Sequence, residues 1–372
     1  MKYVHIFGSR QHADLNSMRN GFKLLVRLVL ATFTLLILFA ISCIAFEEMQ
    51  ANSPKQSLED RSSGAVPLIY SHRYNITAFG MEKLHPFDGT KYKKIQSYLI
   101  AQGMRDSEGF LRPLELSDTQ LQIVHTPEYL KSLKKSRKLA KILEVGPLGI
   151  LPARIVDWRI LKPMRSASGG TLLACRNALN NGVAINIGGG YHHADADEGG
   201  GFCVYSDVPI AIEILRREKL IKTALIIDTD AHQGNGFANV ARSQAGTHVL
   251  DFYDVSIYPY PKVEEDMPVP LAHGTDGGEI LKLVRKNVPE AIARFKPDLV
   301  VYNAGSDVLE SDPLSSLRMS PAELNERDLY VVSYLREKNI PVAMVLAGGY
   351  SKESAMAQAR SIESIVDKFD RR

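Results

Sequence analysis

The stretch ALIIDTDAH, residues 224–232, decides the fold, because a run of apolar residues ends directly in a cluster of acidic and imidazole side chains. A short apolar run bounded by polar residues predicts a strand that is buried on both faces, as in a parallel sheet. Alternate residues of an extended segment point the same way, so Asp228, Asp230 and His232 are expected on one side. Three such groups facing one interior need a cation, because otherwise they repel one another and lack partners.

Two further apolar runs lead to polar side chains in the same way. Val183–Ile187 leads through three glycines to His192 and His193, and Leu299–Tyr302 leads to Asp307. Strands of a parallel sheet end at one edge, where the following loops form a crevice. The three segments are therefore expected to converge at that edge.

The converging side chains match the needs of a catalytic zinc ion, which takes three protein ligands of His, Asp or Glu type and keeps one position open. Asp230, His232 and Asp307 would supply these ligands. Each cluster also has a simpler explanation, since a lone aspartate at a strand end is commonly a helix cap or turn former. Adjacent histidines after glycines can equally be loop residues in contact with solvent.

Helical periodicity alternates with the apolar runs. It is readable in Ile95–Ile100, Ser166–Leu179, Val208–Leu215, Ile280–Phe295 and Leu324–Leu335. Residues 320–323 form a helix start signal, with a capping serine, proline at the first helical position and glutamate at the third. With 45% hydrophobic residues the chain can bury a substantial core, so we expect one large α/β domain with a central parallel β-sheet flanked by helices.

Five motifs carry a family resemblance. They are Gly188–His193 (GGGYHH), Gly199–Cys203 (GGGFC), Ile226–Gly236 (IIDTDAHQGNG), Tyr302–Asp307 (YNAGSD) and Gly348–Tyr350 (GGY). In order and spacing they resemble the zinc-dependent histone deacetylase family, which implies the arginase/deacetylase fold. Tyr74–Thr77 and Glu82–Asp88 resemble the start of the class IV catalytic domain, so the likeness runs from about Pro67 to near the C-terminus.

The resemblance implies a role for each group in the site. Asp230, His232 and Asp307 would bind one zinc ion, and His192 and His193 would transfer protons. Zinc polarises the acyl oxygen and lowers the pKa of water, while a histidine takes the proton of the attacking water. The hydroxyl of Tyr350 would donate to the developing oxyanion. The implied reaction is removal of acetyl or longer fatty acyl groups from lysine side chains of a protein or peptide.

Two more residues would orient the histidines. Asp228 would hold His192 and contact a structural K⁺, as in the family, and Asn235 would hold His193. Many family members have a carboxylate in place of Asn235. Because an amide does not stabilise a charged imidazole as a carboxylate does, His193 should bind protons less well. This fits the preference of class IV for longer acyl chains, and Tyr191, Gly201 and Phe202 are the expected walls of the acyl channel.

Three alternatives have to be weighed. The arginase-like ureohydrolases share Asp230-Ala231-His232 and Asp312-Pro313, but they bind two metal ions, and Gly234 and Leu309 stand where that family would place further aspartates. An acetylpolyamine amidohydrolase would share the zinc chemistry but take a small cationic substrate. A zinc-containing acyl-lysine binding module without turnover would not need Tyr350.

The N-terminal region predicts a membrane anchor. Residues 28–46 contain no charged residue and approach the length of about 20 residues that a membrane-spanning helix needs. Basic residues before and acidic residues after this segment predict a single-pass protein with an extracytoplasmic catalytic domain. The expected organisation is a basic tail (1–27), this helix or signal anchor, a polar linker (47–66) and a catalytic domain (67–372). A cleaved signal peptide, or a cytoplasmic or nuclear protein in which the segment is unused, are the alternatives.

The charge balance gives no reason to expect nucleic-acid binding. Residues 1–27 contain five of the 45 basic and one of the 42 acidic residues, which leaves 40 basic and 41 acidic residues elsewhere. The sequence pI of about 8.5 is thus a property of the tail. The three cysteines form no zinc-finger spacing and no even set of bridges.

Overall fold

The structure is a computed structural model that describes residues 21, 23–32, 64–77 and 85–370. The chain divides into two units, residues 1–54 and residues 55–372, and each is described by itself. Of the first unit, residues 21 and 23–32 are described, and they are helical. The second unit contains every predicted site residue.

A seven-stranded sheet forms the centre of the second unit, and all its strand pairs are parallel. Its order is β1-β2-β7-β6-β3-β4-β5. The strands are β1 (Leu68–Ile69), β2 (Val183–Asn186), β3 (Ala224–Asp228), β4 (Thr247–Asp254), β5 (Met267–Leu271), β6 (Leu299–Asn303) and β7 (Val342–Val345). The predicted parallel sheet is confirmed, including the three apolar runs that become β2, β3 and β6.

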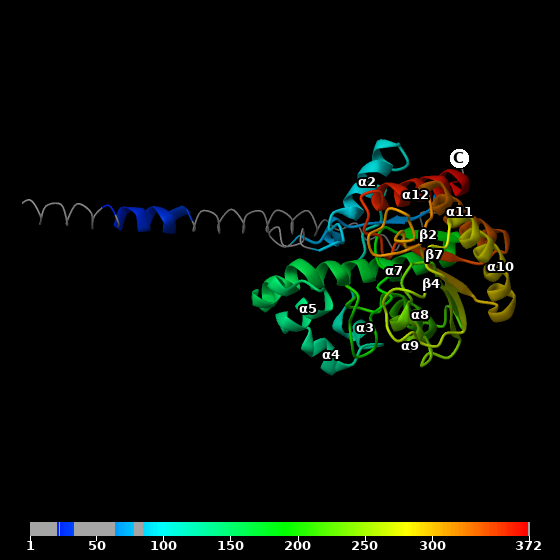
Figure 1. Cartoon of the computed structure of the whole chain (residues 1–372), viewed down its shortest axis with the longest axis horizontal. Coiled ribbons are helices and arrows are strands. Elements are labelled where there is room, and N and C mark those ends of the chain that lie inside the picture. Colours follow the sequence, from blue (N-terminus) through cyan, green and yellow to red (C-terminus); the bar gives the residue numbers. More distant parts are fainter. Residues whose placement is uncertain (1–20, 22, 33–63, 78–84, 371–372) are drawn as a thin grey trace, which may run out of the picture. The chain divides into compact units, whose positions relative to one another are not determined.

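Helices cover both faces of the sheet, as Figure 1 shows for α10, α11 and α12 on one side and α7 and α8 on the other. One apolar core holds Leu225 and Ile227 with α2 (Lys91–Ala101), α10 (Gly277–Phe295), α11 (Pro321–Glu337) and α12 (Ser354–Phe369). The other core holds Ala224 and Ile226 with α7 (Lys162–Asn181), α8 (Asp207–Arg217) and α9 (Asn235–Ala241). Alternate residues of β3 therefore face opposite cores, as expected for a strand buried on both faces.

Short elements lie between β1 and α7. The first, η1 (His72–Tyr74), contributes Tyr74 to the first core. The others extend the second core: α3 (Asp118–Leu121), α4 (Pro127–Ser132), α5 (Ser136–Ile142), η3 (Gly146–Ile150), α6 (Ala153–Val156) and the π-helical turn η4 (Asp157–Leu161). Leu143 and Leu148 from this region are buried. The same two residues line a cavity beside the site, so this region contributes a wall to it.

The register of the central strands brings the predicted site residues to one edge. Asp228, the last residue of β3, lies opposite Asn303 at the end of β6 and opposite Asp251 in β4. The carboxyl ends of β3 and β6 are therefore level, and the loops that follow them start side by side. The helix start signal is also confirmed, because Ser320 and Glu323 form a reciprocal capping box at the start of α11.

The predicted membrane anchor is wrong for the residues that the structure describes. A helix needs about 20 consecutive apolar residues to cross a bilayer, and among the described residues we find none that is long and apolar enough. Of the predicted span, residues 28–32 are helical, and residues 33–46 lie outside the described residues, as do residues 47–63 of the predicted linker. The membrane localisation, with its extracytoplasmic catalytic domain, is therefore withdrawn. The division of the chain at residues 27, 46 and 66, with a catalytic domain from residue 67 onwards, stays a prediction.

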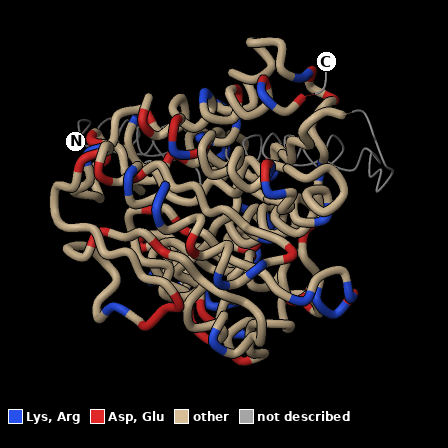
Figure 2. Tube along the Cα trace, turned by 90° about the vertical axis from the view of Figure 1, so that its right-hand side faces the viewer, with Lys and Arg blue, Asp and Glu red and all other residues tan. Residues whose placement is uncertain are grey.

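Basic and acidic residues are interspersed along the trace in Figure 2, where blue and red segments alternate over the visible elements. This distribution agrees with the near-equal charge count beyond the N-terminal tail. That the chain does not bind nucleic acid stays a prediction.

Candidate metal centre

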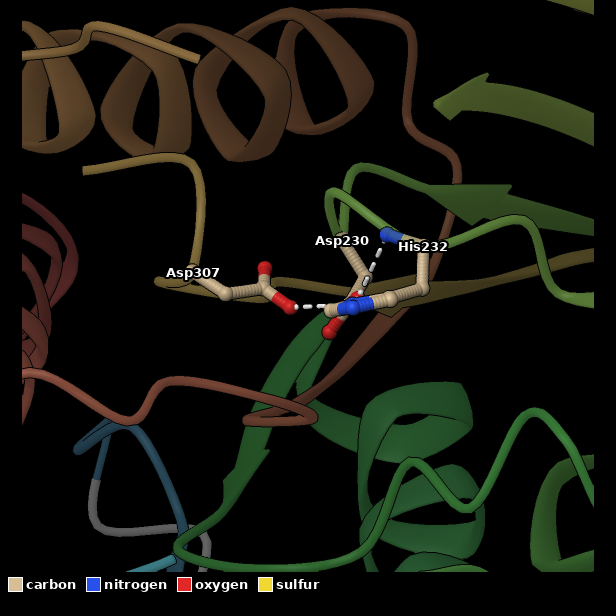
Figure 3. Close-up of side chains that lie close together, drawn as sticks. All are labelled: Asp230, His232 and Asp307. Atoms are coloured by element: carbon tan, nitrogen blue, oxygen red, sulfur yellow. Dashed lines mark hydrogen bonds and ion pairs between the residues drawn. The ribbon is translucent and has the colours of Figure 1, made fainter. Parts of the chain in front are cut away.

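Asp230, His232 and Asp307 come together at the carboxyl edge of the sheet (Figure 3). One ligand atom from each residue lies within 4.8 Å of the others, and all three residues are buried. The Nδ1 atom of His232 lies 2.8 Å from Oδ2 of Asp307 and 3.2 Å from Oδ1 of Asp230. Buried oxygen and imidazole ligands of this kind suit zinc, so this group could bind a metal ion.

Backbone contacts fix the two carboxylates. Asp230 accepts the amide N–H of Gly348 through Oδ2 at 2.8 Å, and Asp307 accepts that of Ala231 through Oδ1 at 2.9 Å. Gly348 has no room for a side chain, because a Cβ there would lie 2.5 Å from Oδ2 of Asp230 and 2.7 Å from Oδ2 of Asp307. The backbone of residue 348 thus packs directly against the ligand oxygens.

The electrostatics of the group favour a cation. Burial and the neighbouring Asp230 carboxylate raise the pKa of Asp307 to about 7. Burial lowers the pKa of His232, but its hydrogen bonds to Asp230 and Asp307 outweigh burial and raise the pKa to about 10. Two buried carboxylates this close repel each other unless a positive charge lies between them, and a metal ion would supply that charge.

His192 lies beside the metal-binding group and is held by Asp228. Its Nδ1 atom is 2.9 Å from Oδ2 of Asp228, and its Nε2 atom is 3.6 Å from Oδ1 of Asp230. Burial lowers the pKa of His192, but the carboxylates of Asp230 and Asp228 outweigh burial and raise the pKa to about 9. Asp228 therefore contacts Nδ1, the ring nitrogen of His192 that points away from Asp230. That is the arrangement expected for an orienting residue, although the catalytic role of both residues stays a prediction.

Asp228 does not extend the metal-binding group, contrary to the expectation that it shares a side with Asp230 and His232. The strand β3 ends at Asp228, so the alternation of side chains stops there. Its Oδ1 atom accepts the Asp230 amide at 3.0 Å and the Asn303 side chain at 2.9 Å. The predicted K⁺ near Asp228 stays a prediction.

His193 has an amide partner, since its Nδ1 atom lies 2.7 Å from Oδ1 of Asn235. Burial and the neighbouring rings of His192 and His232 lower the pKa of His193 well below its usual value. The two adjacent histidines therefore differ in proton affinity, in the direction that the choice of carboxylate and amide partners predicts.

Tyr350 lies close to the metal-binding group. Its ring centroid is 6.2 Å from that of His232 and 5.8 Å from that of Phe202. Its backbone amide donates to Oδ2 of Asp312 at 2.7 Å. Asp312 thus anchors the turn that carries Tyr350, although the sequence only linked this residue to the ureohydrolase alternative.

Two buried charged residues of the site were missed by sequence reasoning. Asp207 accepts the amide N–H groups of Gly190 and Tyr191, each at 2.9 Å, directly before His192. The ammonium group of Lys91 donates to the carbonyl oxygen of Gly348 at 2.9 Å, and burial lowers its pKa to about 8. An aspartate at the start of a helix and a lysine in a helix gave no signal for these roles.

A cavity with about 870 Å³ of empty space, its open mouth included, leads to the site. Tyr191, Gly201 and Phe202 line it, together with His192 and Tyr350. That this cavity is the acyl channel stays a prediction. Phe202 adopts a left-handed backbone with φ of 68°, a conformation that costs energy for a residue with a side chain and often marks functional sites.

The parallel α/β fold and its buried Asp-His-Asp group define a class of metal-binding hydrolases. Residues 85–366 match the histone deacetylase domain family, and the chain belongs to this family. Its members hydrolyse amide bonds of acetylated substrates.

Several known proteins are similar to the chain. Histone deacetylase 2 of Arabidopsis thaliana is 41% identical over 303 residues, which cover 81% of this chain and 78% of the relative. Acetoin utilization protein AcuC of Staphylococcus aureus is 26% identical over 307 residues and 78% of each chain.

Two solved structures share the fold. The HDA15 HD domain gives a TM-score of 0.66 at 19% identity, covering 81% of this chain and 90% of that domain. Acetylpolyamine aminohydrolase of Burkholderia pseudomallei gives a TM-score of 0.64 at 19% identity, covering 82% of this chain and 99% of that enzyme.

Proposed function

We propose that the chain is a zinc-dependent deacylase that removes acyl groups from lysine side chains of a protein or peptide. The observation that carries the proposal is the buried group of Asp230, His232 and Asp307, with Nε2 of His192 3.6 Å from Asp230. Three ligands with an adjacent proton acceptor are what metal-assisted amide hydrolysis requires. In the described residues no second such group accompanies it, which counts against the two-metal ureohydrolase alternative.

The chain's own residues divide the proton transfers. Bound zinc would polarise the acyl carbonyl and lower the pKa of water. His192, held by Asp228, and His193, held by Asn235, would together take up the proton of the attacking water and return one proton to the leaving amine. The Tyr350 hydroxyl would donate to the oxygen that becomes negative.

The cavity supports acyl groups longer than acetyl. Its lining includes an apolar wall, by which we mean Ile76, Leu143, Val145, Leu148, Ile160 and Met164. Each buried methylene contributes about 0.8 kcal/mol to binding, so a long chain would gain from this wall. The same preference follows from the proposed membership of the class IV branch.

The second candidate is a small-molecule deacetylase acting on an acetylated polyamine. It is favoured by the likeness to acetylpolyamine aminohydrolase, which at 19% identity shows the fold alone. A small cationic substrate would leave most of the apolar wall uncovered.

The test is hydrolysis by the zinc-loaded full chain of acetyl-lysine peptide, myristoyl-lysine peptide and acetylated polyamine. We expect turnover of lysine peptides with a larger kcat/KM for myristoyl. Tyr350→Phe should keep zinc but lose about a hundredfold in kcat, because only the oxyanion donor is removed. Turnover of the polyamine alone would replace the proposal by the second candidate. A chain that binds acyl-lysine without turning over any substrate would be the binding module.

A further inference from the structure

Arg327 is a fully buried arginine in α11, on the side of the sheet opposite α7 and α8. Its side chain is 0% exposed, as is that of Asp328, with which it forms an ion pair at 2.8 Å. A buried charge is costly unless it is paired and hydrogen-bonded. The position of Arg327 therefore needs an explanation beyond packing.

The guanidinium group spans the two loops that carry the metal-binding residues. Its Nη1 atom donates to the carbonyl oxygen of Thr229 at 3.0 Å, and its Nη2 atom donates to that of Gly305 at 2.8 Å. Thr229 directly precedes Asp230, and Gly305 lies two residues before Asp307. One rigid side chain thus connects the loop after β3 with the loop after β6.

The loops touch each other where Arg327 connects them. A Cβ on Gly305 would lie 2.6 Å from Cα of Asp230, so glycine is needed for this close approach. A small shift of either loop would change the separation of the Asp230 and Asp307 carboxylates. The guanidinium fork resists such a shift because both of its donors are fixed in one plane.

Asp328 fixes the guanidinium in turn. Its Oδ1 atom accepts Nε of Arg327 at 2.9 Å and the hydroxyl of Tyr302 at 2.6 Å, and its Oδ2 atom accepts the hydroxyl of Ser361 at 2.7 Å. These partners belong to β6 and α12. The connection between the two loops is therefore tied to the sheet and to a helix outside the site.

We propose that Arg327 is a positioning residue of the metal centre, which sets the spacing between Asp230 and Asp307 by holding both loops through one guanidinium group. The proposal rests on the metal centre of the proposed function. Because Arg327 does not touch the substrate or the ligand atoms, its effect is expected on metal affinity and geometry before it is seen in turnover.

The matched control is Arg105, which makes the same kind of contact away from the site. It pairs with Asp370 at 2.6 Å and donates to the carbonyl oxygen of Val66 at 2.8 Å. None of these three residues lines the cavity. A loss of stability without an effect on metal binding is therefore what Arg105→Lys should show.

The experiment measures zinc affinity of the full chain by chelator competition, and the visible spectrum of the Co²⁺-substituted protein. Arg327→Lys keeps the charge but replaces the planar guanidinium, which donates from two separate nitrogens, by a single nitrogen, so the two contacts cannot keep their geometry. We expect zinc affinity to fall about 10- to 100-fold, the usual effect of losing a residue that orients metal ligands, and the Co²⁺ bands to change. Arg105→Lys should leave both unchanged.

The double variant Arg327→Gln/Asp328→Asn covers the case in which Arg327→Lys does not fold, since it buries no unpaired charge. The single amide group that replaces the guanidinium contacts only one of the two loops. We therefore expect the same loss of zinc affinity. Wild-type affinity and Co²⁺ spectrum in a folded variant of either kind would overturn the proposal. Failure of the unaltered chain to bind zinc would instead overturn the metal centre itself.

Discussion

Asp207 illustrates how a single buried carboxylate can place two functional side chains. It accepts two consecutive backbone amides, those of Gly190 and Tyr191, and the hydroxyl of Thr171 at 2.6 Å. Neither histidine can move far from the metal-binding group while both amides are held. Burial raises the pKa of Asp207 and so disfavours its charged form. The main effect of this contact is therefore to fix the position of the loop that carries the histidines.

Replacing Asp207 by Asn should lower kcat at least tenfold while zinc remains bound. An asparagine offers one acceptor to two amides, so the loop before His192 loses a fixed contact. Kinetics and zinc content of the purified variant check this.

Asp298 is a matched control, since it also accepts two consecutive amides, those of Lys222 and Thr223, at the opposite edge of the sheet. Asp298→Asn should leave kcat unchanged. Equal kcat for Asp207→Asn and the unaltered chain would contradict the role.

His125 should make the fold sensitive to acid. Its Nε2 atom accepts the Ser206 amide at 2.9 Å, and burial lowers its pKa to about 4. The unfolded chain, with a histidine pKa near 6.5, therefore binds a proton below pH 6.5 that the folded chain refuses. Stability should fall by about 2 kcal/mol between pH 7 and pH 5 through this residue alone.

Urea unfolding at the two pH values measures this effect. His125→Gln, which has no group that titrates in this range, should lose less stability on acidification than the unaltered chain. The same pH dependence in both chains would exclude His125 as the cause.

The sequence predicts the residues of the site that lie in short strings beside strands. Asp230, His232 and Asp307 could be found because each follows an apolar run at the same edge of a parallel sheet. Arg327 and Lys91 could not, because their partners are remote in the chain: Arg327 donates to a residue 98 positions away, and Lys91 to one 257 positions away. Such contacts depend on the packing of helices, which periodicity alone does not specify.

At the scale of elements, strands and long helices follow from apolar patterns, while the short elements do not. Helix α11 starts where its capping serine predicts, since capping is decided by neighbouring residues. By contrast, β1 has only two residues and is held as a strand by pairing with β2. The helices α3 to α6 are four to seven residues long, too short for a periodic signal.

Ser320→Ala should destabilise the chain by about 1 kcal/mol, the usual effect of losing a helix cap. The hydroxyl of Ser320 accepts the Glu323 amide, and Ser320 lies about two helical turns before Arg327. Zinc affinity should therefore stay within twofold of the unaltered value. Thermal unfolding and chelator competition on the same sample separate the two effects, and a large loss of affinity would mean that the start of α11 also controls the metal centre.

At the scale of the whole molecule, the beginning and end of the described catalytic region are joined. The amide of Val66 donates to Oδ1 of Asp370 at 2.7 Å, across 304 positions of the chain. Arg105 pairs with the same carboxylate and donates to the Val66 carbonyl. The predicted start of the catalytic domain at residue 67 would cut this contact.

A chain of residues 64–372 should therefore be more stable than one of residues 67–372, by about 1 to 2 kcal/mol for the lost contacts of a charged group. Both should hydrolyse the same substrate at similar kcat, since all predicted site residues follow residue 67. Urea unfolding and kinetics compare the two chains. Equal stability would show that Val66 adds nothing to the fold.

Because Val66 and Asp370 are in contact, the fold should not depend on which segment comes first in the chain. A short linker could join these two ends, and the backbone could be opened elsewhere, for instance at the turn of residues 243–246 between α9 and β4, which contains no predicted site residue. Circular permutants tolerate such surface openings when the original ends are close. The deacetylase unit should then assemble from a new first residue, with its metal-binding group built from the same three side chains.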